Sequence, residues 1–276
     1  MQVLLKTTAF TKWAILSLIL FSGQLFSTKV FSKEALSKSA LTSITSPQKH
    51  IYALPVHYTG RVLLGKEGDL TTYSYSWPGV YFEAEFSGAE LDIRLNDANN
   101  ILGIIIDNNE PIVLNRPGKT TYSLSNLGEG KHRVRLEKRT ETQVATGTFE
   151  GFYVAAKDNI LTPATRPRSI EFIGDSFSVG YANLSTSRDC DGETIFTTTN
   201  THQTFGALTA QHFTADYQIN AISGSGVVRN YNGAYPENNF VQFYPYTLVF
   251  DKTHTYQSAW SPNIIVLELG GNDFST

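Results

Sequence analysis

Two stretches of sequence decide the fold: residues 169–176 read SIEFIGDS, and residues 263–273 read NIIVLELGGND. In each, an apolar run leads directly into glycine and small polar residues, and residues 217–226 (YQINAISGSG) repeat the arrangement. Such runs are typical of strands buried on both faces of a parallel sheet. Apolar residues at helical spacing predict a helix over residues 205–213. We therefore predict an α/β domain with a three-layer parallel sheet, incomplete because a doubly wound sheet usually has about five strands.

A different pattern precedes this domain. Residues 80–86 and 91–95 alternate apolar and polar side chains, and further short strands are indicated at residues 102–106, 111–114 and 149–154. Many short alternating strands without helical periods predict an antiparallel β domain of the sandwich or jelly-roll type. We assign residues 55–162 to this jelly-roll domain. The side chains expected in its core include Phe82, Phe86, Ile93 and Val134.

The N-terminal segment resembles an export signal. Lys6 and Lys12 supply positive charge, residues 13–21 (WAILSLILF) are apolar, and small residues follow. We predict a signal peptide over residues 1–27, a leader or linker over residues 28–54, and a secreted or periplasmic protein. A membrane span needs about 20 apolar residues, so no stable membrane insertion is expected. A short N-terminal anchor is the alternative interpretation.

Composition narrows the possible functions. The chain has 276 residues, 41% of them hydrophobic and 17% charged, and its net charge is −3. This balance argues against nucleic-acid binding, which needs a surplus of Lys and Arg. Cys190 is the single cysteine, which excludes an intrachain disulfide and a cysteine-cluster metal site. No metal or organic cofactor is implied.

Three strand ends carry residues suited to catalysis. Ser176 lies at a strand-to-helix turn, where its hydroxyl can act as a nucleophile and its N–H as a donor to an oxyanion. Gly224 allows close approach of the backbone to a ligand, and Asn272 offers a neutral amide donor. Ligands bind at this edge of open α/β sheets. The same residues taken singly could equally form a helix N-cap and ordinary turns.

Taken in order, the three blocks resemble the SGNH (GDSL-type) hydrolase superfamily. With the preceding β domain, the segments IEFIGDSFSVGY, ISGSGVVRNYNG and NIIVLELGGNDFS are similar to carbohydrate esterase family two over about residues 55–276. The resemblance implies that Ser176 is the nucleophile, and that Gly224 and Asn272 join its N–H in the oxyanion hole. It also implies an acyl-serine intermediate and an acetylated polysaccharide or oligosaccharide substrate, such as xylan or glucomannan. Ser225 departs from the larger residue expected between the two glycines.

The general base of the family is a histidine in a D-x-x-H block that follows the third block. No such block follows Asn272, so residues 168–276 are interpreted as the N-terminal part of an SGNH domain, and the chain is expected to be a weak or inactive esterase. Residues 251–254 read DKTH, but they precede the third block. The other histidines lie in unrelated contexts, namely His50, His57, His132, His202 and His212.

Two other functions remain open. A different SGNH activity, such as that of a lipase or thioesterase, would use the same blocks. A non-catalytic glycan-binding protein would need no base. Tyrosines and asparagines are abundant over residues 231–239, which favours sugars over an acyl chain. The polar residues 189–201 are expected to form a loop lining the site.

Overall fold

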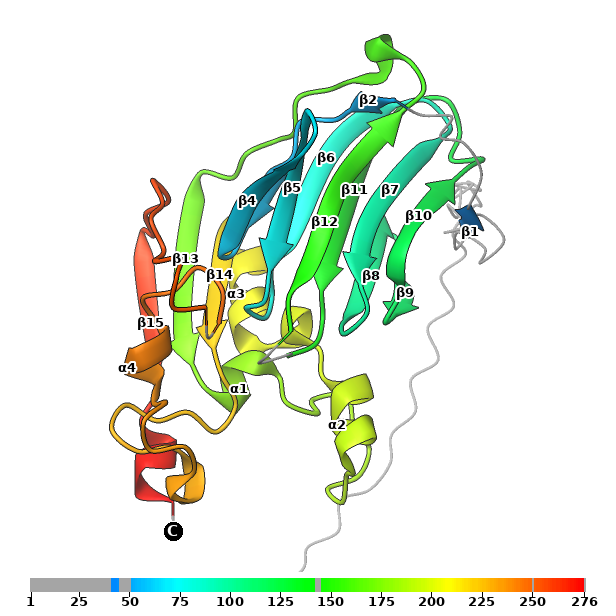
Figure 1. Cartoon of the computed structure of the whole chain (residues 1–276). Helices are drawn as coiled ribbons and strands as arrows, with labels where there is room; N and C mark the ends of the chain where they lie inside the picture. The colour runs from blue at the N-terminus through cyan, green and yellow to red at the C-terminus, as the bar shows by residue number, and fades with distance from the viewer. Residues whose placement is uncertain (1–40, 45–50, 142–144, 250, 276) are drawn as a thin grey trace, which may run out of the picture. The chain divides into compact units, whose positions relative to one another are not determined.

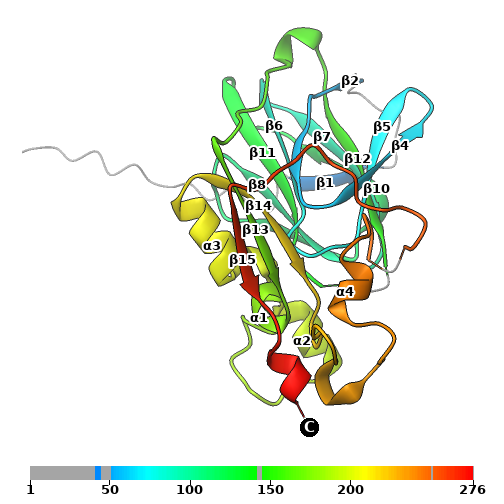
Figure 2. The same cartoon turned by 90° about the vertical axis from the view of Figure 1, so that its left-hand side faces the viewer.

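The computed structural model describes residues 41–44, 51–141, 145–249 and 251–275. The chain divides into two compact units, Met1–Glu34 and Ala35–Thr276, and every described residue belongs to the second. Within that unit, two antiparallel sheets lie beside a parallel sheet (Figures 1 and 2). The antiparallel β domain and the parallel sheet predicted from the sequence are confirmed.

The two antiparallel sheets contain twelve of the described strands. The first has the order β1-β10-β7-β12-β5-β4, and β2 also pairs with β12. Its strands are β1 (Leu41–Ile44), β10 (Gly118–Leu124), β7 (Leu91–Asp97), β12 (Gly147–Val154), β5 (Leu70–Tyr75), β4 (Val62–Glu67) and β2 (Tyr52–Ala53). The second has the order β3-β6-β11-β8-β9. Its strands are β3 (His57–Thr59), β6 (Tyr81–Ser87), β11 (Lys131–Lys138), β8 (Ile101–Ile106) and β9 (Ile112–Asn115).

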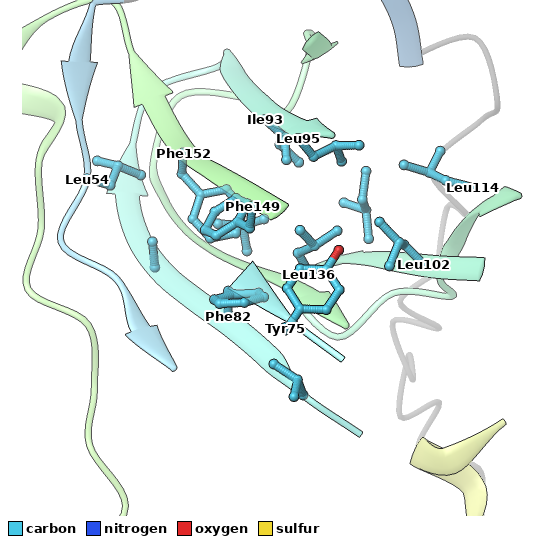
Figure 3. Packing of buried hydrophobic residues seen from close by; sticks show 14 of the residues in the cluster. Leu54, Tyr75, Phe82, Ile93, Leu95, Leu102, Leu114, Leu136, Phe149 and Phe152 are labelled. Carbon is cyan, nitrogen blue, oxygen red and sulfur yellow. The ribbon is translucent and has the colours of Figure 1, made fainter. Parts of the chain in front are cut away.

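Alternating side chains of these strands meet in one apolar core (Figure 3). The Phe149 ring lies 4.6 Å, centroid to centroid, from the rings of both Phe82 and Phe152. The four residues expected in the core are buried, namely Phe82, Phe86, Ile93 and Val134. We call the two antiparallel sheets together the β sandwich. Its finer assignment to a jelly roll stays a prediction.

The parallel sheet has the order β14-β13-β15, with bounds Ala215–Ala221, Arg168–Gly174 and Ile264–Glu268. Gly174 is in register with Ala221 and Glu268, so the carboxyl ends of all three strands meet at one edge. The helices are α1 (Ser176–Val179), α2 (Gly192–Thr198), α3 (Phe205–His212) and α4 (Phe240–Phe243). The 3-10 turns are η2 (Lys157–Asn159), η3 (Thr201–Gln203), η4 (Tyr231–Gly233) and η5 (Gly271–Phe274). Helix α3, the predicted one, packs against β14 and β13.

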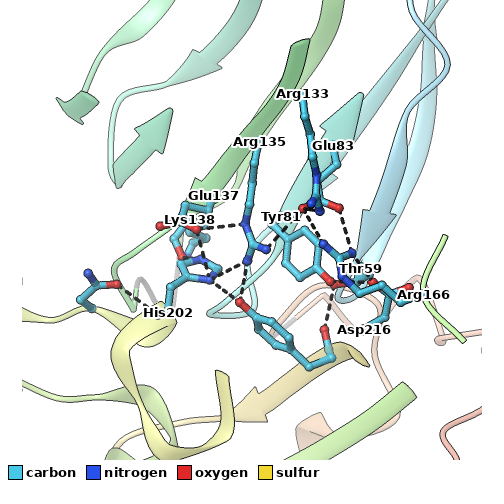
Figure 4. Close-up of polar contacts among 12 residues, drawn as sticks. Thr59, Tyr81, Glu83, Arg133, Arg135, Glu137, Lys138, Arg166, His202 and Asp216 are labelled. Carbon is cyan, nitrogen blue, oxygen red and sulfur yellow. Dashed lines mark hydrogen bonds and ion pairs between the residues drawn. The ribbon is translucent and has the colours of Figure 1, made fainter. Parts of the chain in front are cut away.

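A buried polar network joins the β sandwich to the parallel sheet (Figure 4). Glu83 in β6 accepts hydrogen bonds from Arg133 and Arg166, and Arg166 also bonds Asp216 in β14 at 2.7 Å. Arg135 stacks on Tyr81, its Cζ 3.7 Å from the ring centroid. Because Arg166 binds Glu83 of β6 and Asp216 of β14 at once, the β sandwich helps to fix the position of β14.

Two segments differ from the expectations. Part of the predicted leader forms strands, because β1 pairs with β10 and β2 with β12, each supplying backbone partners to the sheet. The rest of residues 1–50 lies outside the described residues. Within the polar segment 189–201, which the sequence predicts to be a loop, Gly192–Thr198 form helix α2, and the Asp191 carboxylate caps it by accepting from Thr194 N at 2.7 Å. None of the described helices is long and apolar enough to cross a membrane.

Candidate active site

The first block places Ser176 at the start of α1. Asp175 is the N-cap residue, and its Oδ1 accepts a hydrogen bond from Phe177 N at 3.2 Å. The N-cap and nucleophile interpretations are thus compatible, because different residues of the block fill them. Gly174 makes the turn possible, since a Cβ there would lie 2.1 Å from Ser178 Oγ. Ser176 is partly exposed, and its N–H donates no hydrogen bond to a described residue.

The second block turns at Gly224, whose φ of +75° favours glycine. Its carbonyl accepts from Tyr231 N at 2.8 Å, while its own N–H has no partner among the described residues. Asn230 is buried beneath the turn, where its Oδ1 accepts from Gly226 N at 3.2 Å. The amide of Asn230 donates to the Tyr235 carbonyl at 3.1 Å. The loop is therefore held by side-chain bonds.

The third block connects the other two. Asn272 Nδ2 donates to Asp175 Oδ2 at 3.0 Å and to the Ser225 carbonyl at 2.9 Å. The structure thus brings Asn272 to the residues that flank Ser176 and Gly224 in the chain. Both N–H donors of the amide are engaged in these bonds. An oxyanion could receive a hydrogen bond from this amide only by replacing one of them.

Asp273 fastens the third block to the second. Its carboxylate accepts the backbone N–H groups of Val227, Val228 and Arg229 at 2.9, 2.6 and 2.9 Å. Burial opposes ionisation, but these three donors lower the pKa of the Asp273 carboxyl below its usual range. A Cβ at Gly226 would lie 2.7 Å from Asp273 Oδ2, so only glycine fits there.

Two carboxyl groups lie beside the nucleophile position. Burial raises the pKa of Asp175, although the Phe177 N–H and the Ser176 hydroxyl oppose the rise. Burial and the neighbouring Asp175 also raise the pKa of Glu268 at the end of β15. Glu268 Oε2 accepts from Ser178 Oγ at 3.2 Å. The edge therefore holds two partly desolvated carboxyl groups whose ionised forms are disfavoured.

A pocket of about 520 Å³ adjoins Gly224. It is lined by Ile222, Ser223, Gly224, Ser225, Asn230, Tyr231, Ala234, Tyr235, Asn238 and Phe243. Tyr231 and Tyr235 are exposed at 59% and 73%. The β sandwich contributes to this loop, because Glu141 Oε1 accepts from Ser223 N at 2.7 Å. Aromatic faces beside amide groups provide the surface that a sugar ring requires.

The described histidines all have partners other than Ser176. His57 pairs with Asp216, His132 with Asp107, and His254 with Asp251. The His202 ring bonds the Tyr217 hydroxyl and the Lys138 carbonyl, and the His212 ring packs on Phe213. His50 lies outside the described residues. Among the described histidines, none forms a hydrogen bond with Ser176.

Sequence reasoning missed the supporting residues of the site. Asp175 and Asp273 belong to the two motifs, but their spacing alone does not reveal which amide or backbone groups they bind. Asn230 and Glu141 lie outside the motifs, and Glu141 reaches the site from the β sandwich. The one available signal is that asparagine follows the Gly-rich block closely, as expected of a residue that binds a turn.

The chain is similar to known proteins over both of its regions. Residues 58–163 match the family model "Carbohydrate esterase 2 N-terminal", and residues 170–276 match "GDSL-like Lipase/Acylhydrolase". An acetylxylan esterase / glucomannan deacetylase of Cellvibrio japonicus is 50% identical over 224 residues, which are 81% of this chain. The chain belongs to carbohydrate esterase family 2. It spans 62% of the length of that relative.

Solved structures of family 2 carbohydrate esterases show the same fold. One, whose active site is described as displaying divergent catalytic and non-catalytic binding functions, has a TM-score of 0.76 and 48% identity. The alignment covers 82% of this chain and 67% of that one. Another, from Clostridium thermocellum in complex with cellohexaose, has a TM-score of 0.70 and 32% identity, covering 80% and 67%.

Proposed function

We propose that the protein is a carbohydrate O-acetyl esterase that removes acetyl groups from plant-type polysaccharides such as xylan and glucomannan. The observation that carries the proposal is the position of Asn272, whose amide bonds both the GDS block and the Ser-Gly-Ser-Gly loop. The 50% identical relative that is named for these two substrates supports the choice of substrate.

In the proposed mechanism, the Ser176 hydroxyl attacks the acetyl carbonyl carbon and gives its proton to a base. The bond between that carbon and the sugar oxygen then breaks, and the sugar leaves with a proton. Water hydrolyses the acetyl-serine to acetate and restores Ser176. The N–H groups of Ser176 and Gly224 stabilise the oxygen on which negative charge develops.

Asn272 completes the oxyanion hole in this proposal by exchanging one hydrogen bond. The Ser225 carbonyl is its neutral acceptor, so the amide can turn that N–H toward an anionic oxygen while Asp175 still holds the other. Asp175 is therefore assigned a positioning role. The base is not assigned to any described histidine, because each has other partners.

The pocket beside Gly224 favours a sugar over a long acyl chain. Tyr231 and Tyr235 offer exposed aromatic faces, while Asn230 and Asn238 also line the pocket. The finer proposal is that the β sandwich is a jelly roll that supports this loop through Glu141. The export-like composition of residues 1–27 supports a secreted or periplasmic enzyme that meets polysaccharide outside the cell.

The proposal is tested by measuring acetate released from acetylated xylan and acetylated glucomannan. The unmutated protein should release acetate, and Ser176→Ala should lower the rate to background. Ser187→Ala, which changes an exposed serine, is the matched control and should retain the full rate. Equal rates for the protein and Ser176→Ala would contradict the mechanism.

A second function is glycan binding without turnover, which the exposed rings of Tyr231 and Tyr235 beside Gly224 would also support. That function predicts no acetate release in any variant, together with glycan binding that Tyr231→Ala weakens. Acetate release that depends on Ser176 would exclude it.

A further inference from the structure

A second hollow lies away from Ser176, between the start of β4 and residues 253–260. Its volume is about 680 Å³, within the range of ligand pockets. The lining residues are Tyr58, Gly60, Val62, Leu63, Leu64, Gln218, Thr247, Thr253, His254, Thr255, Tyr256, Gln257, Ser258 and Trp260. None of these is Asp, Glu, Lys or Arg. We call this hollow the β4 groove.

The β4 groove lies toward the opposite end of the strands from Ser176. Trp260 precedes β15, and Asn263 N bonds the Ser169 carbonyl near the start of β13. Ser176, in contrast, follows the end of β13. The residues of the groove and those of the pocket beside Gly224 are entirely different. A ligand of the groove would therefore have its own contacts.

The aromatic wall of the groove is held in place before any ligand binds. The Tyr256 hydroxyl accepts from Gln218 Nε2 at 2.9 Å, and Tyr256 N donates to the Pro245 carbonyl at 2.7 Å. The Arg61 guanidinium stacks on the Tyr256 ring, its Cζ 4.5 Å from the centroid. A wall fixed in this way loses little conformational freedom on binding.

Residues 251–254, two of which line the groove, are also held by hydrogen bonds. The Asp251 carboxylate accepts from Thr253 N at 2.9 Å and pairs with His254 Nδ1 at 2.7 Å. Thr247 N donates to the His254 carbonyl at 2.8 Å. The one imidazole in the lining therefore has its own carboxylate partner, which holds the ring in place.

The floor of the groove holds an unpaired acceptor. Gln218 is 2% exposed, and its Oε1 has no hydrogen-bond partner among the described residues, although its Nε2 binds Tyr256. An unpaired buried polar group costs free energy that a donor can recover. Because this oxygen is itself inaccessible to solvent, a ligand hydroxyl reaches it only when the Gln218 side chain turns toward the groove.

We propose that the β4 groove is a second carbohydrate-binding site, which takes a short neutral oligosaccharide independently of the acetyl site. A phosphate or carboxylate would find no cation in the lining, and an acyl chain would leave amides and hydroxyls unpaired. A sugar ring presents an apolar face to Tyr58, Tyr256 or Trp260 and hydroxyls to the exposed Gln257. The site would hold the polysaccharide while other units are deacetylated.

Titration calorimetry with acetyl-free cellohexaose and xylohexaose tests the proposal. At least one of the two should bind the unmutated protein, and Trp260→Ala should weaken this binding about tenfold, the usual cost of losing an aromatic anchor. Gln257→Ala, an exposed change that spares the fold, should weaken it about fivefold. Tyr52→Ala alters an exposed aromatic outside the groove and should have no effect.

Tyr231→Ala separates the groove from the pocket beside Gly224. We expect Tyr231→Ala to leave oligosaccharide binding at the groove intact. We expect Trp260→Ala to weaken that binding but to leave p-nitrophenyl acetate hydrolysis unchanged. Three results would overturn the proposal: no binding by the unmutated protein, binding unchanged in Trp260→Ala and Gln257→Ala, or equal loss in Tyr231→Ala. Because these readouts measure binding without acetyl groups, they are independent of the esterase proposal.

Discussion

The β sandwich and the parallel sheet each have an apolar core, but they differ in how far their strands are covered. In the sandwich, Ile93 of β7 is 0% exposed within a continuous apolar core, whereas Ile265 of β15 is 58% exposed. The candidate site lies in the second region, and there the loops are held by Asp175, Asn230 and Asp273 through hydrogen bonds. Apolar packing therefore stabilises both regions, while polar contacts position the loops of the site.

The largest expected effect comes from equal truncations in the two regions. Ile93→Ala should lower the free energy of unfolding by about 2–5 kcal/mol, because it leaves a cavity in a closed core. Ile265→Ala removes the same atoms from a largely exposed side chain and should change the free energy of unfolding by less than about 0.5 kcal/mol. Urea denaturation of both variants measures the difference. Equal losses would remove the contrast between the regions.

The next effect concerns the polar side of the comparison. Asn272→Ala should lower kcat for acetyl-ester hydrolysis about 10²–10³-fold with little change in KM, the usual cost of losing one oxyanion donor. Asn99→Ala changes an exposed asparagine of the β sandwich and is the control. A loss confined to KM would instead show that Asn272 only positions the sugar.

A smaller effect is expected at the loop that Asp273 holds. The pKa of Asp273 is lowered in the folded protein, so its carboxylate stabilises the loop fully at pH values above the ordinary aspartate pKa of about 3.9. This stabilisation is lost as the pH falls through the lower pKa of the folded protein. Asp273→Ala should speed amide hydrogen exchange at Val227, Val228 and Arg229 at neutral pH. The three lost bonds are worth about 1–3 kcal/mol locally. Exchange unchanged in the variant would exclude this role.

The smallest effect concerns the contact between the regions. Burial and the nearby Arg135 hold the pKa of His202 well below its usual range. The unfolded chain therefore binds a proton below about pH 6.5 that the folded protein does not, so the free energy of unfolding falls as the pH drops, by at most about 1.4 kcal/mol per pH unit. His202→Gln should flatten this slope between pH 7 and 5, whereas His212→Gln should not. Parallel slopes for all three proteins would contradict the assignment.

Much of the scaffold could be predicted because its residues repeat a simple pattern. Phe82 and Ile93 alternate with polar neighbours, and Ile264 and Ile265 belong to an unbroken apolar run, so strand type follows directly from the sequence. Strand β1 and helix α2 could not be predicted in this way. Their residues are polar or weakly periodic, and they form because β10 offers an open edge and Asp191 caps a turn.

For the site, the three blocks could be predicted but not their connections. The strand ends place Ser176, Gly224 and Asn272 at one edge. Asn272 donates one N–H to Asp175 and the other to the Ser225 carbonyl, and these bonds depend on tertiary distances that no local pattern reveals. The contribution of Glu141 from the β sandwich is likewise a long-range contact without a local pattern. The catalytic roles of the three residues stay predictions.

The most direct test of the central claim, that these blocks form one ester-hydrolysing edge, is to trap the acyl-enzyme. The protein is mixed with p-nitrophenyl acetate, quenched in acid and digested for mass spectrometry. The account predicts an acetyl group on the peptide that contains Ser176, lost in Ser176→Ala and formed more slowly in Asn272→Ala. Acetylation at another residue only, or turnover that persists in Ser176→Ala, would contradict it.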